Sequence, residues 1–279
     1  TPLLVHGVPR DSALPLASEI AALVRSHGAE PALVGVHAGN PIVGLNDSEL
    51  ADLLADRSVP KANTANLGAL VHARSHAATT VSTTMELAAA AGVRLFATGG
   101  IGGVHKGYGT RLDISSDLAA FTRFPLAVVT SGVKSILDVE STREALETLG
   151  IPVVGFQTDR FPAFYIRASE AGVDCRFDDV ESLADFVRFE LSRTGRGIVI
   201  ANPIPASDEI DPVSWSRWLD LATQSAASSS TQGRSVTPRI LAELHTVSGG
   251  RTLAANIALA KSNASLAAQI AGQLPRHEQ

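Results

Sequence analysis

Apolar runs alternate with segments of helical spacing along most of the chain. Between the runs, three segments repeat apolar residues at helical spacing and stop at a glycine: Leu14–Gly28, Ser82–Gly92 and Ser182–Gly195. This alternation predicts an α/β fold, with a mainly parallel central sheet and helices on both of its faces. The short apolar runs expected to form buried strands are Pro31–His37, Arg94–Gly100, Phe124–Val129, Ile151–Phe156 and Gly197–Pro205.

The C-terminal third has a different pattern. Residues Ser225–Ser235 are rich in serine and are expected to form an exposed loop. Two helical patterns follow, Thr237–Gly250 and Arg251–Leu274, and we expect them to pack beside the functional site rather than form an independent domain. Residues 1–279 are therefore interpreted as a single α/β domain.

Composition narrows the class of protein. The chain has 279 residues, 45% of them hydrophobic, and no apolar run long enough to cross a membrane. A formal net charge of -5 argues against nucleic acid as a partner. The one cysteine, Cys175, cannot form an internal disulfide, so we expect a protein of the reducing cytoplasm. Because Met85 is the only methionine and a strand-like run begins at once, a preceding segment is expected to be missing from the sequence.

Lysine is scarce, and one lysine has a suggestive position. Of 23 basic residues only four are lysines, and Lys134 lies in "TSGVKSILD", just after a predicted strand. Open α/β sheets bind ligands at this edge, and lysine, unlike arginine, can lose its proton and act as a nucleophile. A surface lysine is the alternative. Downstream, Ser141 and Glu144 have the spacing of a helix-capping box, and Gly150 is expected to end that helix.

Two further segments suggest an anion or a cation site. The glycine-rich stretch Ala97–Gly107 follows a strand, so its backbone N–H groups can approach an anion, although it matches neither a P-loop nor a dinucleotide motif. In "RLDISSDL", Asp113 and Asp117 flank two serines, which suits a hard cation or a phosphate, or else an ordinary helix cap. The residues alone thus indicate a phosphate-binding α/β enzyme with a candidate amine nucleophile.

Five motifs in one order carry a family resemblance. The chain resembles the pseudouridine-5′-phosphate glycosidase family, also called indigoidine synthase A-like, from "HGVP" near the start to "LAANIALAKSNA" near the end. The resemblance implies cleavage of the C–C glycosidic bond of pseudouridine 5′-phosphate to uracil and ribose 5-phosphate. It also implies a divalent metal, Mn²⁺ or another such as Mg²⁺, and a homotrimer. The motifs are "FATGGIGGVHKG", "DISSDL", "SGVKSILD", "LGIPVVGFQTDRFPAFY" and "ANPIP".

The family motifs also imply roles for single residues. Lys134 matches the nucleophilic lysine, and Asp113 matches the metal-binding aspartate. The family's proton-donating glutamate would lie immediately before Thr1, outside this sequence. The segment around Tyr108, Gly109 and Thr110 departs from the family, which leaves the base specificity open. The positions matched to substrate binding are Lys61, Val81, His105, Ser115, Ser116, Asp117 and Asn256.

The implied chemistry explains the need for an amine. A C–C bond to C1′ lacks the protonatable leaving oxygen of an ordinary glycoside, so a carboxylate pair is insufficient. A lysine attached at C1′ can form an iminium as the bonding electrons leave towards uracil. We expect burial and the neighbouring charge of Lys61 to favour the neutral amine of Lys134. The alternatives are a Schiff-base lyase or glycosidase for another phosphosugar conjugate, and a non-catalytic family member without the glutamate.

Overall fold

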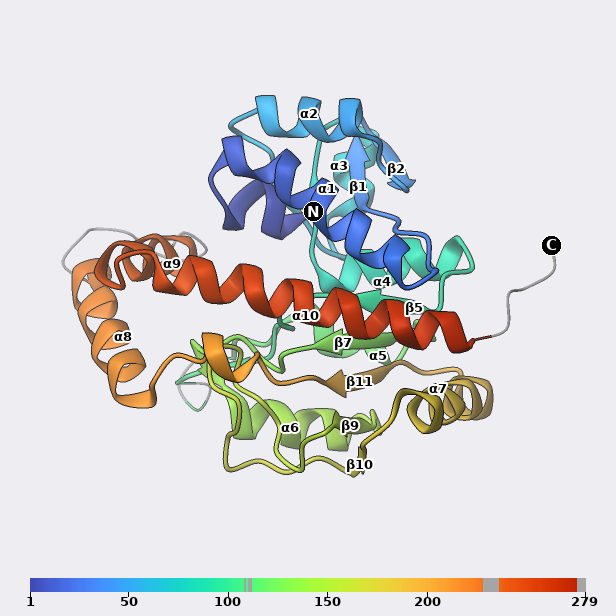
Figure 1. Ribbon diagram of the computed structural model, residues 1–279. Helices are drawn as coiled ribbons and strands as arrows, with labels where there is room; N and C mark the ends of the chain where they lie inside the picture. The colour runs from blue at the N-terminus through green and yellow to red at the C-terminus, as the bar shows by residue number, and fades with distance from the viewer. Residues whose placement is uncertain (108, 110–111, 228–235, 275–279) are drawn as a thin grey trace.

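The centre of the protein is a five-stranded sheet in which every adjacent pair of strands is parallel (Figure 1). The structure is a computed structural model that describes residues 1–107, 109, 112–227 and 236–274. Four of the five predicted strands lie in this sheet, which confirms the predicted α/β class. Across the sheet the order is β10 (Cys175–Phe177), β9 (Val153–Phe156), β11 (Ile198–Ala201), β7 (Ala127–Thr130) and β5 (Leu95–Ala97).

Helices cover both faces of the sheet, and successive strand residues point to opposite faces. On one face, Val129 and Ile200 pack in a cluster with residues of α7 (Val180–Thr194) and α10 (Arg251–Gln273). On the other face, Val128 and Val199 pack with α4 (Val81–Ala90), α5 (Ser116–Phe121) and α6 (Val139–Thr148). Burial on both faces is why these strands appear in the sequence as continuous apolar runs.

The predicted strand Pro31–His37 is the exception. Its ordered part, β1 (Val34–His37), pairs antiparallel with β2 (Asn40–Val43), outside the main sheet. The turn between them has φ values of 48° at Ala38 and 80° at Gly39. Two consecutive residues of positive φ produce the tight hairpin turn that suits the twist of paired strands. The chain therefore folds straight back and does not cross over to a parallel neighbour.

The rest of the N-terminal region lies above α10 in Figure 1. It contains η1 (Leu3–Gly7), α1 (Arg10–Ser26), α2 (Asp47–Ala55) and α3 (Leu67–His72). A two-stranded parallel pair, β3 (Lys61–Ala62) and β4 (Ala78–Thr79), leads into α4. Its core includes Leu16, Leu53 and Val59, and it is completed by Leu253 and Ile257 of α10.

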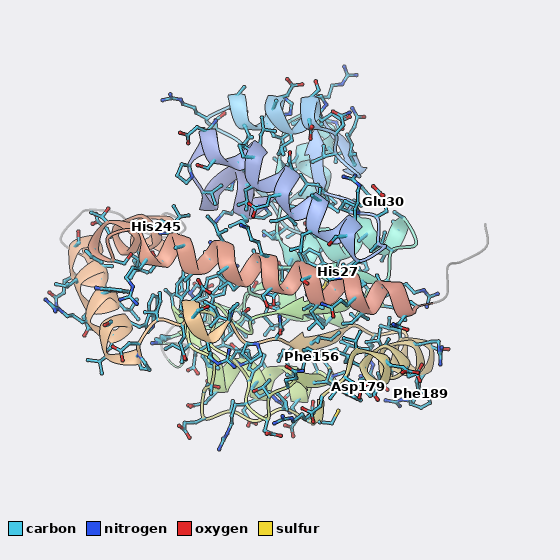
Figure 2. All side chains as sticks on the ribbon, viewed as in Figure 1. His27, Glu30, Phe156, Asp179, Phe189 and His245 are labelled. Carbon is cyan, nitrogen blue, oxygen red and sulfur yellow. The ribbon has the colours of Figure 1, made fainter. Side chains whose placement is uncertain are left out.

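Polar contacts fix α10 to its neighbours. His27, which follows α1, shares a hydrogen bond of 2.9 Å between its Nε2 and Ser265 Oγ of α10 (Figure 2). His245 of α9 (Val236–Val247) shares one of 2.8 Å between its Nδ1 and Thr252 Oγ1 of α10. Helix α10 therefore connects the N-terminal region, the sheet and the C-terminal helices.

The predicted helices form, with shifted ends. Segment Leu14–Gly28 corresponds to α1, Ser82–Gly92 to α4 and Ser182–Gly195 to α7. Helix α1 begins earlier than predicted and keeps Pro15 inside it. Gly195 takes a left-handed conformation with φ 64° at the end of α7, as expected of a glycine stop.

The predicted capping box at Ser141 and Glu144 is wrong. Helix α6 begins at Val139, and the Asp138 side chain accepts a hydrogen bond of 2.9 Å from the N–H of Ser141. A carboxylate three residues upstream therefore occupies the cap, and Ser141 lies inside the first turn. Gly150, with φ 68°, follows the end of this helix as predicted.

The two predicted C-terminal helices correspond to α9 and α10. They are preceded by η2 (Ala206–Asp208) and α8 (Pro212–Ala227). Of the predicted loop Ser225–Ser235, residues 225–227 belong to α8, and 228–235 lie outside the described residues. Two short strands, β6 (Val104–His105) and β8 (Leu137–Asp138), pair antiparallel beside the sheet. None of the helices in the described ranges is long and apolar enough to span a membrane.

Candidate active site

The segments that follow β5, β7 and β11 meet at the carboxyl edge of the sheet, where parallel sheets place their ligands. The glycine loop, which we define as Gly99–Gly103, follows β5. The lysine turn, which we define as Ser131–Ser135, follows β7. Asn202 follows β11 directly.

The lysine turn lies against the glycine loop. The backbone N–H of Lys134 donates to the carbonyl of Ile101 at 3.2 Å, and Ile101 forms a parallel bridge with Val133. Val133 and Ser135 are buried, whereas Lys134 is exposed. The expectation of a buried Lys134 is therefore wrong: its two neighbours turn inward in the extended chain, and its own side chain points outward. The predicted position of Lys134 near the end of a core strand is confirmed.

Lys61 reaches the same region from β3, at the end of a different pair of strands. Desolvation by the surrounding protein and the positive charge of Lys134 together lower the pKa of the Lys61 amine, although Lys61 keeps part of its surface exposed. Desolvation, followed by the charges of Lys61 and Arg10, lowers the pKa of His6 to about 4. The positive charge of Lys134 thus lies close enough to Lys61 to disfavour the protonation of Lys61.

Asp117 organises the glycine loop. Its buried carboxylate accepts hydrogen bonds from the backbone N–H of Gly102 at 2.8 Å and of Ser82 at 2.9 Å. Ser115 caps α5 and donates its own N–H to the carbonyl of Gly103 at 3.0 Å. A Cβ added to Gly102 would lie 2.2 Å from Ser115 Oγ, so only glycine fits there. One carboxylate therefore joins the loop to the starts of α4 and α5.

Hydroxyl groups cluster at the start of α4. Ser82 Oγ lies 3.0 Å from Ser116 Oγ and 2.9 Å from Thr80 Oγ1. Val81 is the first residue of α4, and its side chain is buried in the core. A helix N-terminus with adjacent hydroxyls suits a phosphate group, because N–H groups and the helix dipole both favour an anion.

Asp113 and His105 lie next to each other in the backbone. The N–H of His105 donates to the carbonyl of Asp113 at 3.0 Å, and His105 pairs with Leu137 across β6 and β8. Asp113 is exposed, and the cap of α5 is Ser115, so Asp113 is not a helix cap. Within the described part of the chain no three His, Cys, Asp or Glu side chains gather as a metal site. Tyr108 and Thr110 lie outside the described residues.

Helix α10 closes the site from the other side. Asn256 is half-buried near the glycine loop: a Cβ on Gly99 would lie 3.4 Å from its Oδ1. Asn263, which the sequence analysis missed, is fully buried. Its Nδ2 donates to the Thr98 carbonyl at 2.8 Å, and its Oδ1 accepts from Asn202 Nδ2 at 2.9 Å. The available signal was an asparagine among small apolar residues inside a long helix. Because burial of an unpaired amide is costly, such an asparagine indicates hydrogen-bond partners within the core.

Of the predicted site residues, Lys134, Ser115, Asp117 and Asn256 thus lie against the glycine loop, and Lys61 lies close to Lys134. Val81 and Ser116 begin α4 and α5, and His105 and Asp113 are paired through their backbones. The arrangement offers an exposed amine, a second amine of lowered pKa, a glycine loop with an anion-binding helix start, and an exposed carboxylate. Such a set can hold a phosphorylated sugar and present an amine to its C1 carbon.

Comparisons with known proteins agree with this chemistry. A family model described as "Indigoidine synthase A like protein" matches residues 1–273. A pseudouridine-5′-phosphate glycosidase of Methylobacterium nodulans is 45% identical over 96% of this chain and 80% of its own length. That of Geobacillus kaustophilus is 42% identical over 98% and 91%.

Two solved structures are similar in fold. The prealnumycin C-glycosynthase AlnA, in complex with ribulose 5-phosphate, superposes with a TM-score of 0.89 at 32% identity, covering 96% of this chain and 88% of AlnA. An indigoidine synthase A-like protein of Thermotoga maritima superposes with a TM-score of 0.87 at 36% identity, covering 97% and 89%.

Proposed function

Since the chain belongs to the indigoidine synthase A-like family, we propose that it is a pseudouridine-5′-phosphate glycosidase that works through a lysine Schiff base. The observation that carries the proposal is the meeting of the lysine turn, the glycine loop and Lys61 at one sheet edge. Lys134 is the proposed nucleophile, because its amine is exposed while its backbone is anchored to the glycine loop.

The proposed reaction has three steps. The neutral amine of Lys134 bonds to C1′ while the C1′–O4′ bond breaks and O4′ takes a proton. The attached nitrogen then loses a proton, and its lone pair forms a C=N bond as the C1′–C5 bonding electrons pass to C5 of uracil, which takes a proton. Water hydrolyses the resulting iminium and releases ribose 5-phosphate. The family resemblance assigns the donation of the proton to O4′ to a glutamate.

The other residues have supporting roles in this proposal. The hydroxyl of Ser116, beside the N-terminus of α4, is the proposed phosphate contact. Lys61 contacts the substrate, and the lowered pKa of its amine makes Lys61 more readily neutral than an ordinary lysine. Val81, His105, Ser115, Asp117 and Asn256 complete the proposed substrate pocket.

A divalent cation fits Asp113. One exposed carboxylate beside a substrate pocket suits Mn²⁺ or Mg²⁺, which keep several waters and need few protein ligands. We therefore propose that Asp113 holds the cation, which when bound would neutralise charge on oxygens of the substrate.

An activity on another phosphosugar conjugate should be tested together with the proposed one. The similar fold of a C-glycosynthase in complex with ribulose 5-phosphate favours a related C–C lyase as the alternative. Measuring uracil release from pseudouridine 5′-phosphate beside other C-nucleotides separates the two.

The predicted homotrimer can be tested by light scattering coupled to size exclusion. A cytoplasmic location remains proposed on the exposed free thiol of Cys175, which suits a reducing compartment.

Chemical trapping tests the covalent step. The protein is incubated with ribose 5-phosphate and borohydride, which reduces an imine to a stable amine. Peptide mapping should place one sugar phosphate on Lys134, and Lys134→Arg should abolish both the adduct and turnover. Lys261→Arg is the matched control, because Lys261 pairs with Glu19 elsewhere. No adduct, or an adduct on Lys61 alone, would remove Lys134 as the nucleophile.

A further inference from the structure

A tight turn on a neighbouring segment holds the lysine turn on both sides of Lys134. We call Phe161–Ile166 the aromatic turn. Before the lysine, the carbonyl of Ser131 accepts from the N–H of Phe164 at 2.8 Å, and Gly132 forms a bridge with Ala163. After the lysine, Ser135 Oγ donates to the carbonyl of Ala163 at 2.5 Å and accepts from the N–H of Tyr165 at 3.3 Å.

The contact before the lysine leaves no room for adjustment. Gly132 has a φ of 77°, and a Cβ there would lie 1.7 Å from the carbonyl oxygen of Pro162. The two backbones are therefore packed directly on each other. Ser135 is the one residue of the lysine turn whose side-chain hydroxyl bonds to the aromatic turn among the interactions of the described residues.

The aromatic turn is itself fixed. Phe164 has a φ of 63°, which is unfavourable for a side chain of this size. Backbone bonds between Ala163 and Ile166, at 2.9 and 3.3 Å, hold the turn closed. The buried ring of Phe164 lies on the glycine loop, where a Cβ on Gly100 would be 2.5 Å from it. A residue held in such a conformation marks a place that its surroundings over-determine.

The outer side of the turn is anchored as well. The rings of Phe164 and Tyr165 meet edge to face with centroids 4.6 Å apart, and Tyr165 lies 5.2 Å from Trp215 of α8. Tyr165 and Trp215 belong to one buried cluster, which includes Leu259 of α10. The aromatic turn is therefore a rigid support that contacts both the glycine loop and the lysine turn.

We propose that Ser135 is a positioning residue for the amine of Lys134. Its hydroxyl fixes the backbone of the lysine turn to the aromatic turn, so that the Cα of Lys134 keeps one place relative to the glycine loop. This inference rests on the proposed covalent role of Lys134. The side chain of an exposed lysine has many rotamers, so its direction depends on a fixed backbone. A small shift of the lysine turn would therefore move the amine and slow its attack on C1′.

The experiment compares two serines with the same bonding pattern. Ser169 Oγ also donates to a carbonyl of the aromatic turn, that of Phe161 at 2.6 Å, and accepts from the N–H of Ala171 at 3.2 Å. It is not part of the lysine turn. Ser135→Ala and Ser169→Ala thus remove equivalent hydroxyls from the same support, and only the first should affect the amine.

Three readouts separate positioning from loss of structure. For Ser135→Ala we expect kcat for uracil release to fall about 10- to 100-fold with KM changed far less, a range typical of small misplacements. Borohydride trapping with ribose 5-phosphate should slow by a similar factor yet still reach one adduct per chain, because every molecule is folded. Ser169→Ala should keep the wild-type kcat and trapping rate. Ser135→Cys, which keeps the shape but donates weakly, should be slowed as well and serves if the alanine variant does not fold.

The outcomes are distinct. If folded Ser135→Ala or Ser135→Cys traps ribose 5-phosphate at the wild-type rate, Ser135 does not position Lys134. If Ser169→Ala is slowed equally, the effect comes from the support as a whole, and the specific role of Ser135 is wrong. If the wild-type protein itself forms no adduct on Lys134, the proposed function has failed instead.

Discussion

Replacing Asp117 by asparagine tests the claim that one buried carboxylate organises the site. Asp117 is 3% exposed, and its two oxygens accept separate backbone N–H groups, from Ser82 and Gly102. Asparagine has nearly the same shape but offers one acceptor. Its NH₂ group would face one of the two donors with no hydrogen bond possible.

The two hydrogen bonds set the expected loss. A hydrogen bond to a charged group contributes about 1.5–3 kcal/mol, against about 1 kcal/mol for a neutral one. Asp117→Asn loses one charged bond and turns the other into a neutral one, so the free energy of unfolding should fall by about 3 kcal/mol. For a chain of 279 residues that corresponds to a melting temperature lower by about 5 °C.

Thermal and urea unfolding followed by circular dichroism measure this change. Asp113→Asn is the matched control, since it alters an exposed carboxylate of the same motif and should stay within about 0.5 kcal/mol of wild type in metal-free buffer. Uracil release should fall in Asp117→Asn, because the glycine loop loses its attachment. If Asp117→Asn unfolds like the control, the carboxylate does not hold the loop and the argument fails.

Three further changes test other parts of the structure. Gly132→Ala would place a Cβ 1.7 Å from the Pro162 carbonyl oxygen, so we expect little folded protein, and a soluble variant of normal melting temperature would contradict this contact. Lys61→Gln should raise the free energy of unfolding at pH 7, because a lowered pKa means that protonated Lys61 is disfavoured in the folded state. The gain should shrink as the pH rises towards 10.5, the ordinary pKa of a lysine, because the folded protein loses this proton before the unfolded chain does, and an equal gain at pH 7 and pH 10 would refute it. Asp113→Asn should abolish Mn²⁺ binding in calorimetry without unfolding the protein, and unchanged affinity would exclude Asp113 as the ligand.

The sequence was sufficient for four of the five strands of the main sheet, because the three central strands β9, β11 and β7 are largely buried on both faces. Continuous apolar runs such as Phe124–Val129 have few other places in a soluble fold. The pairing of Pro31–His37 was beyond such reasoning. Its hairpin depends on a positive φ at Ala38. Alanine is not typical of such turns, so the sequence does not indicate this conformation, which the surrounding structure imposes.

The location of Lys134 was predictable, and its environment was not. A lysine after a core strand must lie at the ligand-binding edge, which the structure bears out. The exposure of its side chain depends on which of three successive residues faces inward, and Val133 and Ser135 do. Lys61 reaches Lys134 from a separate pair of strands. Without the family resemblance, no spacing in the sequence could reveal that the two lysines lie near each other.

The least predictable feature is what shapes the glycine loop. Glycines supply little side-chain packing, so the conformation of such a loop has to be imposed by groups from elsewhere. Here these groups are the carboxylate of Asp117, the amide of Asn263 and the ring of Phe164, which come from three distant segments. The "DISSDL" motif contains two aspartates, of which Asp113 is exposed and Asp117 is buried on the loop. Sequence spacing cannot separate a carboxylate that holds the loop from one free to bind a cation, because the difference arises only when α5 packs against the glycines. The shape of the glycine loop is thus set by these three supporting groups. Replacing one of them should alter catalysis through the shape of the loop rather than through a contact with the substrate.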